Sequence, residues 1–242
     1  MRGRLRLWQP KVGYRFSVDP LLLCDFVVAG HASLGRVVDL GTGSGIVALA
    51  LAERDPQARV VAVEVQPRLA ELARRNAIEN ELSERVEIAE LDLAEPRAAK
   101  ALPGAAFELA VSNPPFRPLS DGPPSPNPEE AVAKHELRLS LPQLVKEARR
   151  MLVPGGRLAL VYPAARLVAL IEALQIEGLR PSRARFVHDK LEEPARRVLL
   201  EAEKGGRGAC VIERPFLLRR ADGTYTDEAR AALGEPWVKP GS

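Results

Sequence analysis

Two short segments combine residue types suited to holding a ligand and to acting on a polar group. The first, Asp39-Leu40-Gly41-Thr42-Gly43-Ser44-Gly45, joins an apolar run to an amphipathic stretch through three closely spaced glycines. Glycine lets a chain turn sharply and approach a ligand without a Cβ clash. The second, Ser112-Asn113-Pro114-Pro115-Phe116, also follows an apolar run. We therefore expect both segments to lie at strand ends, where ligands bind in α/β proteins.

The spacing of the glycines distinguishes between possible ligands. A dinucleotide-binding turn follows G-x-G-x-x-G, but here Gly45 comes one residue early and Ile46 occupies the expected position. Asp39, directly before the turn, would repel a pyrophosphate but could accept hydrogen bonds from the ammonium of a methionine moiety. The pattern predicts that Asp39, Gly41, Gly43 and Gly45 bind S-adenosyl-L-methionine.

Two further carboxylates follow the next apolar runs. Glu64 ends the second run, roughly 20 residues after the turn, where an acidic group can hold both ribose hydroxyls. Asp92 ends the third run, where it could meet an adenine ring. Each carboxylate alone is better explained as a helix cap or a surface charge. Together, at the ends of three successive predicted strands, the carboxylates favour a cofactor site.

The Asn113–Phe116 segment offers hydrogen-bond acceptors for an exocyclic amine. The lone pair of such an amine is delocalised into its ring, so an enzyme gains by accepting hydrogen bonds from the N–H groups. The side-chain oxygen of Asn113 and the carbonyl oxygen of Pro114 could do this beside the cofactor, and Phe116 could stack on the base, worth roughly 1 to 3 kcal/mol. Taken alone, the tetrapeptide could equally be a simple strand-ending turn.

The elements that must position these residues alternate between short apolar runs and stretches of helical period. Strands are predicted over residues 36–40, 59–65, 85–91, 107–112, 157–162, 183–188 and 197–203, and helices over 18–28, 45–54, 67–80, 141–152 and 163–177. The expected fold is α/β and Rossmann-like: a doubly wound, mostly parallel seven-stranded sheet with an antiparallel C-terminal edge. Residues 114–128 contain seven prolines and are predicted to form a loop beside the site.

Composition and charge narrow the class of protein. No stretch approaches the roughly 20 apolar residues of a membrane span, and residues 1–20 lack the apolar run of a signal peptide, so we expect a cytoplasmic protein without membrane contact. The two cysteines and three histidines are scattered and indicate no metal site. Residues 1–20 carry five Lys/Arg against one acid, and residues 180–220 eleven against six. Basic ends suit a phosphate backbone, although a solvated surface explains them equally well.

Several of these segments resemble known families. The glycine turn with its acidic partners resembles the class I S-adenosylmethionine-dependent methyltransferase superfamily, and Asn-Pro-Pro-Phe resembles the motif of amino-methyltransferases. Residues 14–23, 133–136, 198–206 and 223–226 are similar to segments of the bacterial valine-tRNA adenine-N6 methyltransferases. Phe116 stands where a tyrosine is common in that family, which keeps stacking but removes a hydroxyl.

The resemblance implies a division of the chain and a reaction. Residues 1–29 would be an arm and helix over the cofactor site, 30–220 the methyltransferase domain and 221–242 a C-terminal tail. The implied reaction is methylation of adenosine N6 in a structured RNA, with tRNA near the anticodon as the expected partner. Arg15 and Phe16 would contact the cofactor, and the implied substrate contacts are Pro115, Phe116, His135 and Glu136.

Other functions remain open at this point. A protein-glutamine N5 methyltransferase or an rRNA guanine-N2 methyltransferase would share the Asn-Pro-Pro-aromatic chemistry. The basic ends, and the lack of a sizeable separate N-terminal recognition domain, count against the glutamine enzyme. A non-catalytic RNA-binding or cofactor-binding module is the alternative from another class, and the intact glycine turn together with Asn113 counts against it. The sequence leaves the oligomeric state undetermined.

Overall fold

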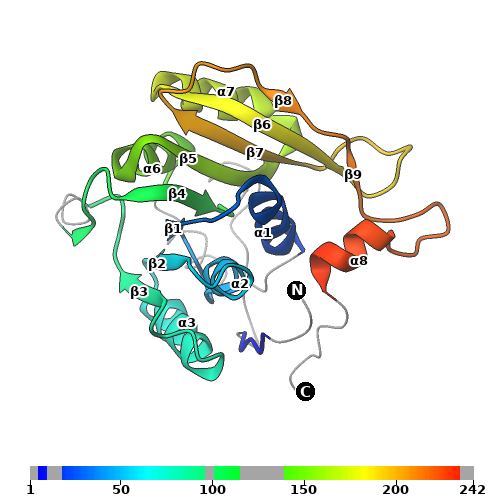
Figure 1. Ribbon diagram of the computed structural model, residues 1–242. Helices are drawn as coiled ribbons and strands as arrows, with labels where there is room; N and C mark the ends of the chain where they lie inside the picture. Colours follow the sequence, from blue (N-terminus) through cyan, green and yellow to red (C-terminus); the bar gives the residue numbers. More distant parts are fainter. Residues whose placement is uncertain (1–4, 10–17, 96–100, 115–138, 235–242) are drawn as a thin grey trace, which may run out of the picture.

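The computed structural model describes residues 5–9, 18–95, 101–114 and 139–234 and is built around one mixed β-sheet (Figure 1). Its strands are β1 Arg36–Leu40, β2 Arg59–Glu64, β3 Val86–Glu90, β4 Phe107–Ser112, β5 Leu152–Pro163, β6 Leu179–His188, β7 Arg197–Lys204, β8 Val211–Ile212 and β9 Phe216–Leu217. The order across the sheet is β3-β2-β1-β4-β5-β7-β6-β8, and β9 also pairs with β6.

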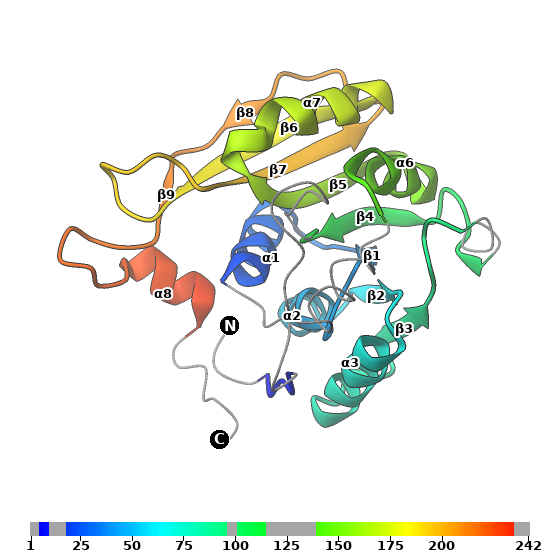
Figure 2. The ribbon, with the colours of Figure 1, turned by 180° about the vertical axis from the view of Figure 1, so that it is seen from behind.

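Helices cover both faces of this sheet (Figures 1 and 2). They are α1 Asp19–Gly30, α2 Ile46–Arg54, α3 Pro67–Glu79, α6 Leu141–Met151, α7 Leu167–Ile176 and α8 Asp227–Leu233, with a short 3-10 turn η1 at Ala164–Arg166. Helices α1, α2 and α8 contribute to one buried apolar cluster and α6 and α7 to a second. Alternate strand residues serve the two clusters: in β1, Val37 faces the first and Val38 the second. No helix in the described part of the chain is long and apolar enough to cross a membrane.

The predicted α/β class and the mostly parallel sheet are confirmed. Strands β1 to β5 pair in parallel, and β7 runs antiparallel to both of its neighbours, β5 and β6. The predicted count of seven strands needs correction, because the sheet of the described residues has nine. The additional strands, β8 and β9, have two residues each and pair with β6. Strands this short carry too few residues to show a period in the sequence.

Other differences from the prediction include the start of one strand and the presence of one helix. Strand β5 begins at Leu152, directly after α6, and takes in Pro154, Gly155 and Gly156, which were expected to separate a helix from a strand. A register shift against β4 between Phe107 and Leu109 accommodates this irregular start. Helix α8 was not predicted at all, and it lies in the segment expected to be a tail.

Helix α8 is packed onto the domain. Ala229 and Ala232 are buried in the same apolar cluster as α1, at 0% and 1% exposure. The Thr226 side chain caps the helix by accepting the Ala229 N–H, and Glu228 pairs with Arg185 at 2.6 Å. Residues 221–234 therefore form part of the folded structure.

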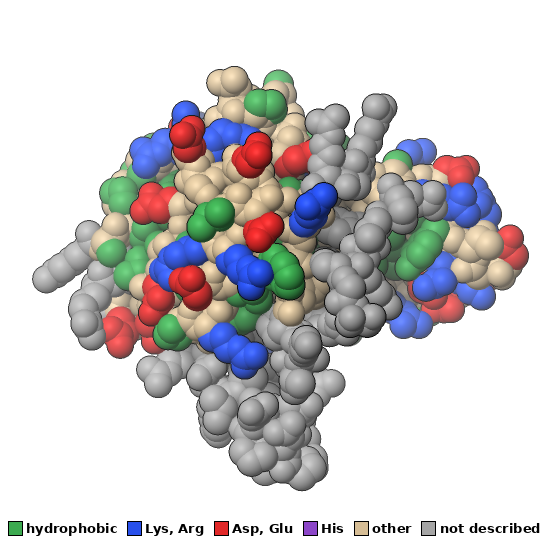
Figure 3. All heavy atoms as spheres, turned by 90° about the horizontal axis from the view of Figure 1, so that it is seen from below, with side chains coloured by type: hydrophobic (Ala, Val, Ile, Leu, Met, Phe, Trp, Pro, Cys, Tyr) green, Lys and Arg blue, Asp and Glu red, His purple; other side chains and the backbone are tan. Residues whose placement is uncertain are grey.

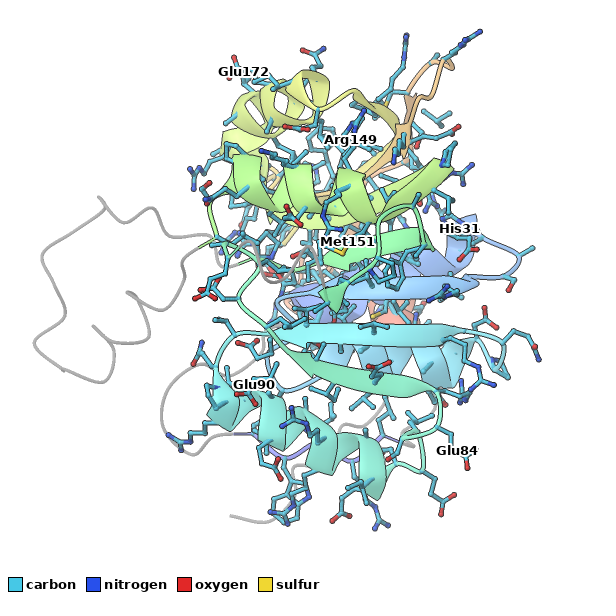
Figure 4. The ribbon with its side chains drawn as sticks, turned by 90° about the vertical axis from the view of Figure 1, so that its left-hand side faces the viewer. His31, Glu84, Glu90, Arg149, Met151 and Glu172 are labelled. Atoms are coloured by element: carbon cyan, nitrogen blue, oxygen red, sulfur yellow. The ribbon has the colours of Figure 1, made fainter. Side chains whose placement is uncertain are left out.

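The parallel strands give the sheet two different edges. Figure 4 shows Glu90, at the carboxyl end of β3, on one side of the molecule, and Glu84 and His31 on the other. The residues that follow β1, β2 and β4 therefore share the edge marked by Glu90, because these strands run parallel to β3. This carboxyl edge is where the predicted site residues meet.

Candidate active site

The glycine turn between β1 and α2 has the backbone that its sequence predicted. Gly41, Gly43 and Gly45 have φ angles of +77°, +60° and +89°, in the region that favours glycine. Among the described residues, a Cβ added at Gly41 or Gly43 would meet nothing within 4 Å, whereas at Gly45 it would lie 3.3 Å from the Cβ of Ala73. The first two glycines therefore border open space where a ligand could approach the backbone, and the third permits close packing against α3.

Asp39 is buried at the end of β1, with 1% of its surface exposed. Its Oδ2 accepts hydrogen bonds from Thr42 Oγ1 at 2.6 Å and from the Ala48 N–H at 3.2 Å. Its Oδ1 is also buried and has no hydrogen-bond partner among the described residues. Burial raises the pKa of Asp39 to about 7, against the lowering effect of the bonds from Thr42 and Ala48. One carboxylate oxygen is thus left to receive a cationic group.

Glu64 ties the end of β2 to the glycine turn. Its side chain is 5% exposed, and Oε2 accepts the Gly43 N–H at 2.8 Å. The neighbouring Val63 carbonyl accepts the N–H groups of Gly41 and Thr42 at 3.0 and 2.9 Å. The end of β2 therefore fixes the shape of the turn and places a carboxylate beside it, as the sequence predicted.

Asp92 lies in the turn after β3, which ends two residues earlier at Glu90. Its Oδ1 accepts the Ala94 N–H at 2.9 Å. The N–H of Leu91 donates to the Glu64 carbonyl at 3.0 Å, so the turn is attached to the end of β2. Asp92 is therefore at the predicted edge of the sheet, one strand beyond Glu64.

Asn113 directly follows β4, the strand that lies beside β1 on the opposite side from β2. The Ser112 hydroxyl donates to the Leu40 carbonyl at 2.7 Å and so joins the ends of the two strands. Asp39 is in register with Val111, which brings Asn113 to the same edge of the sheet. The Oδ1 atom of Asn113 is buried and, within the described residues, accepts no hydrogen bond. Such an acceptor is costly to bury unless a ligand satisfies it.

These features fit S-adenosylmethionine. The open side of the turn at Gly41 and Gly43 leaves room for a ligand against the backbone, and Asp39 presents a buried oxygen beside it. Asn113 presents a second buried oxygen on the neighbouring strand, at the predicted position of the acceptor amine.

Some predicted site residues lie outside the described residues. They are Arg15, Phe16, Pro115, Phe116, His135 and Glu136, and their roles stay predictions. Pro114 is described and is half-buried next to Asn113.

Two residues with contacts to the site were not predicted. Thr42 donates to Asp39, and Asn76 donates from Nδ2 to the Ser44 carbonyl at 2.8 Å. The available signal for Asn76 was a polar residue on the helix face that otherwise carries Ala73 and Ala77.

The charges of the C-terminal region are extensively paired. Arg185 pairs with Glu228 at 2.6 Å, Arg197 with Asp19 at 3.1 Å, and Arg220 with Asp227 at 2.8 Å. Acidic and basic side chains are also interspersed on the face seen in Figure 3. The basic excess counted for residues 180–220 is therefore partly compensated by acids from other segments.

Comparison with known proteins gives consistent matches along the chain. Residues 20–169 match the family model described as the methyltransferase small domain. A protein of Porphyromonas gingivalis named tRNA1(Val) (adenine(37)-N6)-methyltransferase is 38% identical, over 97% of this chain and 92% of its own. Proteins of the same name from Aeromonas hydrophila and Parabacteroides distasonis are 34% and 30% identical, over 88% and 82% of this chain and 86% and 80% of theirs.

Solved structures show the same fold. The crystal structure of a predicted O-methyltransferase from Agrobacterium tumefaciens aligns with a TM-score of 0.70 at 25% identity, over 89% of this chain and 97% of that one. TrmN from Thermus thermophilus aligns with a TM-score of 0.55 at 26% identity, over 76% of this chain and 48% of that one.

Proposed function

Since this chain belongs to the methyltransferase small-domain family, and within the class I S-adenosylmethionine-dependent methyltransferases to the tRNA1(Val) adenine-N6 family, we propose that it methylates N6 of an adenosine in tRNA. The observation that carries the proposal is a pair of buried oxygens, Oδ1 of Asp39 and Oδ1 of Asn113, which lie on neighbouring strands and have no hydrogen-bond partner among the described residues. One can receive an ammonium and the other an amine N–H. The names of its relatives specify adenine 37 of tRNA1(Val), which is therefore the proposed target.

The carboxyl edge of the sheet would hold the cofactor. Asp39 would pair with the ammonium of the methionine part, and the open backbone at Gly41 and Gly43 would lie against it. Glu64 and Asp92 stand where the ribose and the adenine are expected. S-adenosylmethionine, when bound, supplies a methyl group that is activated by its sulfonium.

Asn113 would prepare the acceptor. Its buried Oδ1 can accept one N–H of the adenine amine, and the Pro114 carbonyl can accept the other. Both bonds keep electron density on the nitrogen, and they strengthen as that nitrogen becomes more positive in the transition state. The site thus favours the transition state with neutral acceptors already in place. A tRNA substrate also implies a cytoplasmic protein.

The direct test is methylation of total tRNA. Purified protein, labelled S-adenosylmethionine and tRNA should yield N6-methyladenosine in digested nucleosides measured by mass spectrometry. Label recovered only in protein, or as N2-methylguanosine, would overturn the assigned substrate. Treatment with ribonuclease before the reaction is the control, and it should abolish incorporation.

The role of Asn113 has its own test. Asn113→Ala should lower kcat by a factor of about 10² to 10³, the usual effect of removing one preorganised hydrogen-bonding group that acts in the transition state. The Kd for S-adenosylmethionine, measured by calorimetry, should stay within about twofold. Asp39→Ala is the matched comparison, and its main effect should be on that Kd. An equal loss of cofactor affinity in both variants would contradict separate roles for the two oxygens.

A further inference from the structure

A short N-terminal segment, residues 5–9, is attached to helix α3 and is called the arm below (Figure 1). Asn80 accepts the Arg6 N–H at 2.8 Å and donates to the Arg6 carbonyl at 2.7 Å. Asn76 likewise accepts the Trp8 N–H at 2.8 Å and donates to the Trp8 carbonyl at 3.1 Å. Residues four apart share a face of a helix, and residues two apart share a side of an extended chain. The two side-chain amides are therefore in register with the backbone of the arm.

Asn76 differs from Asn80 in a third contact. Its Nδ2 also donates to the Ser44 carbonyl in the glycine turn, at 2.8 Å. The other side-chain hydrogen bond that Asn80 donates goes to the Asn76 carbonyl within α3, at 2.7 Å. Asn76 is fully buried, so its three hydrogen bonds satisfy both amide hydrogens and the oxygen without water. One side chain thus joins the arm, the helix and the turn.

We propose that Asn76 is a positioning residue for the cofactor, through which the arm and the glycine turn order each other. The proposal rests on the proposed function only for the identity of the ligand, S-adenosylmethionine. No part of it requires tRNA.

The contact acts on the peptide unit between Ser44 and Gly45. Asn76 holds the carbonyl of this unit, and the Gly45 N–H donates to the Thr42 carbonyl at 3.0 Å. Both ends of the peptide plane are therefore fixed, although the glycines at 43 and 45 allow the backbone unusual freedom. Without the Asn76 amide, ordering this turn would have to be achieved when the cofactor binds, which weakens affinity.

The arm is held at the same point by a ring contact. The guanidinium of Arg75 lies 3.9 Å from the centre of the Trp8 ring, and Arg75 precedes Asn76 in α3. Trp8 is nevertheless 41% exposed, so burial of its side chain is only part of what fixes the arm. Leu7 also anchors the arm, since it is 5% exposed in the apolar cluster of α1 and α2, and the backbone bonds to Asn76 and Asn80 fix the register of the arm on α3.

The pair Asn76→Ala and Asn80→Ala separates coupling from simple attachment of the arm. Each variant loses two bonds to the arm, but only Asn76→Ala loses the bond to the turn. We expect the Kd and KM for S-adenosylmethionine to rise about five- to a hundredfold in Asn76→Ala, as for loss of a buried hydrogen bond. In Asn80→Ala they should change less than twofold. The kcat at saturating cofactor should stay within about threefold in both variants.

Hydrogen exchange tests whether ligand binding in the glycine turn orders the arm. S-adenosylhomocysteine should slow amide exchange in residues 5–9 of the wild-type protein at least threefold. In Asn80→Ala, amide exchange of the arm without ligand should be faster than in the wild type, and the ligand should still slow it. In Asn76→Ala, the ligand should no longer slow it. The wild-type measurement needs no variant, so it can overturn the proposal even if Asn76→Ala does not fold.

Three results would overturn the proposal: unchanged exchange of the wild-type arm on ligand binding, equal effects of the two alanine variants on cofactor affinity, or a wild-type Kd in Asn76→Ala. Failure of the wild-type protein to bind S-adenosylhomocysteine would have a different meaning. It would refute the proposed function, and the inference would fall with it.

Discussion

Two buried oxygens with different charge define the site at the scale of single residues. Asp39 offers a carboxylate that ionises with difficulty, because burial raises its pKa. Asn113 offers a neutral oxygen whose hydrogen-bonding strength does not change with pH in the ordinary range. Binding of the methyl donor, S-adenosylmethionine, should therefore depend on pH more strongly than the hydrogen bond between Asn113 and the acceptor amine.

The pKa of Asp39 leads to a first prediction. Burial raises this pKa from 3.8 to about 7, so the folding stability that the protonated group provides is fully present below pH 3.8 and is lost as pH rises through 7. A cationic ligand needs the ionised form. Affinity for S-adenosylmethionine should therefore fall up to about tenfold per pH unit below pH 7. Calorimetry between pH 5.5 and 7.5 measures this.

Asp39→Asn is the control for the pH effect. It keeps the shape of the side chain but cannot ionise, so its cofactor affinity should be weaker and independent of pH over the same range. A wild-type affinity that does not change between pH 5.5 and 7.5 would show that Asp39 does not pair with the ammonium.

At the scale of elements, the turn that carries the chemistry was predictable and its surroundings were not. Three closely spaced glycines between an apolar run and a helical stretch indicate a tight turn that uses positive φ angles, and the observed φ angles agree. The contact between Asn76 and Ser44 joins residues far apart in sequence, and no local pattern indicates which buried polar side chain meets which carbonyl. The edge strands β8 and β9 exist only because β6 provides a partner.

Matched glycines allow the ligand role of the turn to be separated from its backbone strain. Gly43 and Gly178 have φ angles of +60° and +67°, and a Cβ added at either would meet no described residue within 4 Å. Alanine at either position should cost roughly 1 to 2 kcal/mol of unfolding free energy, because of the left-handed conformation. Only Gly43→Ala should also weaken S-adenosylmethionine binding, by tenfold or more, as its Cβ enters the ligand space. Denaturant titration and calorimetry measure the two effects.

The comparison fails if Gly178→Ala weakens cofactor binding as much as Gly43→Ala does. In that case the loss would come from general destabilisation of the fold.

Helix α8 provides a prediction about packing. Ala232 is buried against the α1 cluster, whereas its neighbour Ala231 is exposed on the same helix. Ala232→Asp would bury a charged side chain in an apolar cluster and should lower the unfolding free energy by more than about 3 kcal/mol. Ala231→Asp has nearly the same effect on helix propensity and should change it by less than about 1 kcal/mol. Equal losses in thermal or denaturant unfolding would show that α8 is not docked as described.

At the scale of the whole molecule, the ligand site and a buried group of charges involve different strands of the sheet. The carboxyl edge gathers Asp39, Glu64 and Asn113, and Asp39 and Asn113 each have a buried oxygen that no described residue contacts by a hydrogen bond. Elsewhere, the 3% exposed Glu201 side chain of β7 contacts His31, at the end of α1, at 2.7 Å and Arg183 of β6 at 3.3 Å. The buried charge of Glu201 is thus fully compensated and joins elements distant in sequence.

Glu201 should stabilise the fold at neutral pH. Burial raises its pKa, but the hydrogen bond and charge of His31 and the charge of Arg183 outweigh this and hold the pKa below its ordinary value. Its contribution is therefore present above the unfolded pKa of 4.5 and is lost as pH falls through the lower folded value. Glu201→Gln should cost on the order of 3 kcal/mol at pH 7, and less below pH 4.5, in denaturant unfolding.

The matched control for Glu201→Gln is an exposed acid. Glu193 pairs with Arg196 at 3.0 Å, with 37% and 66% of the two side chains exposed. Glu193→Gln should change the unfolding free energy by less than about 1 kcal/mol at any pH. A Glu201→Gln variant as stable as Glu193→Gln at pH 7 would contradict the role given to Glu201.

The position of β7 between β5 and β6 has a consequence for synthesis of the chain. Asp39, Glu64 and Asn113 all leave the ribosome before the strand that pairs with the outer side of β5. Until residue 204 has emerged, β5 is an unprotected edge with buried-type residues such as Leu158 and Leu160, the kind of surface that pairs with other chains. A nascent chain that has emerged beyond residue 163 but not as far as residue 204 would therefore display a nearly complete cofactor site on an aggregation-prone sheet.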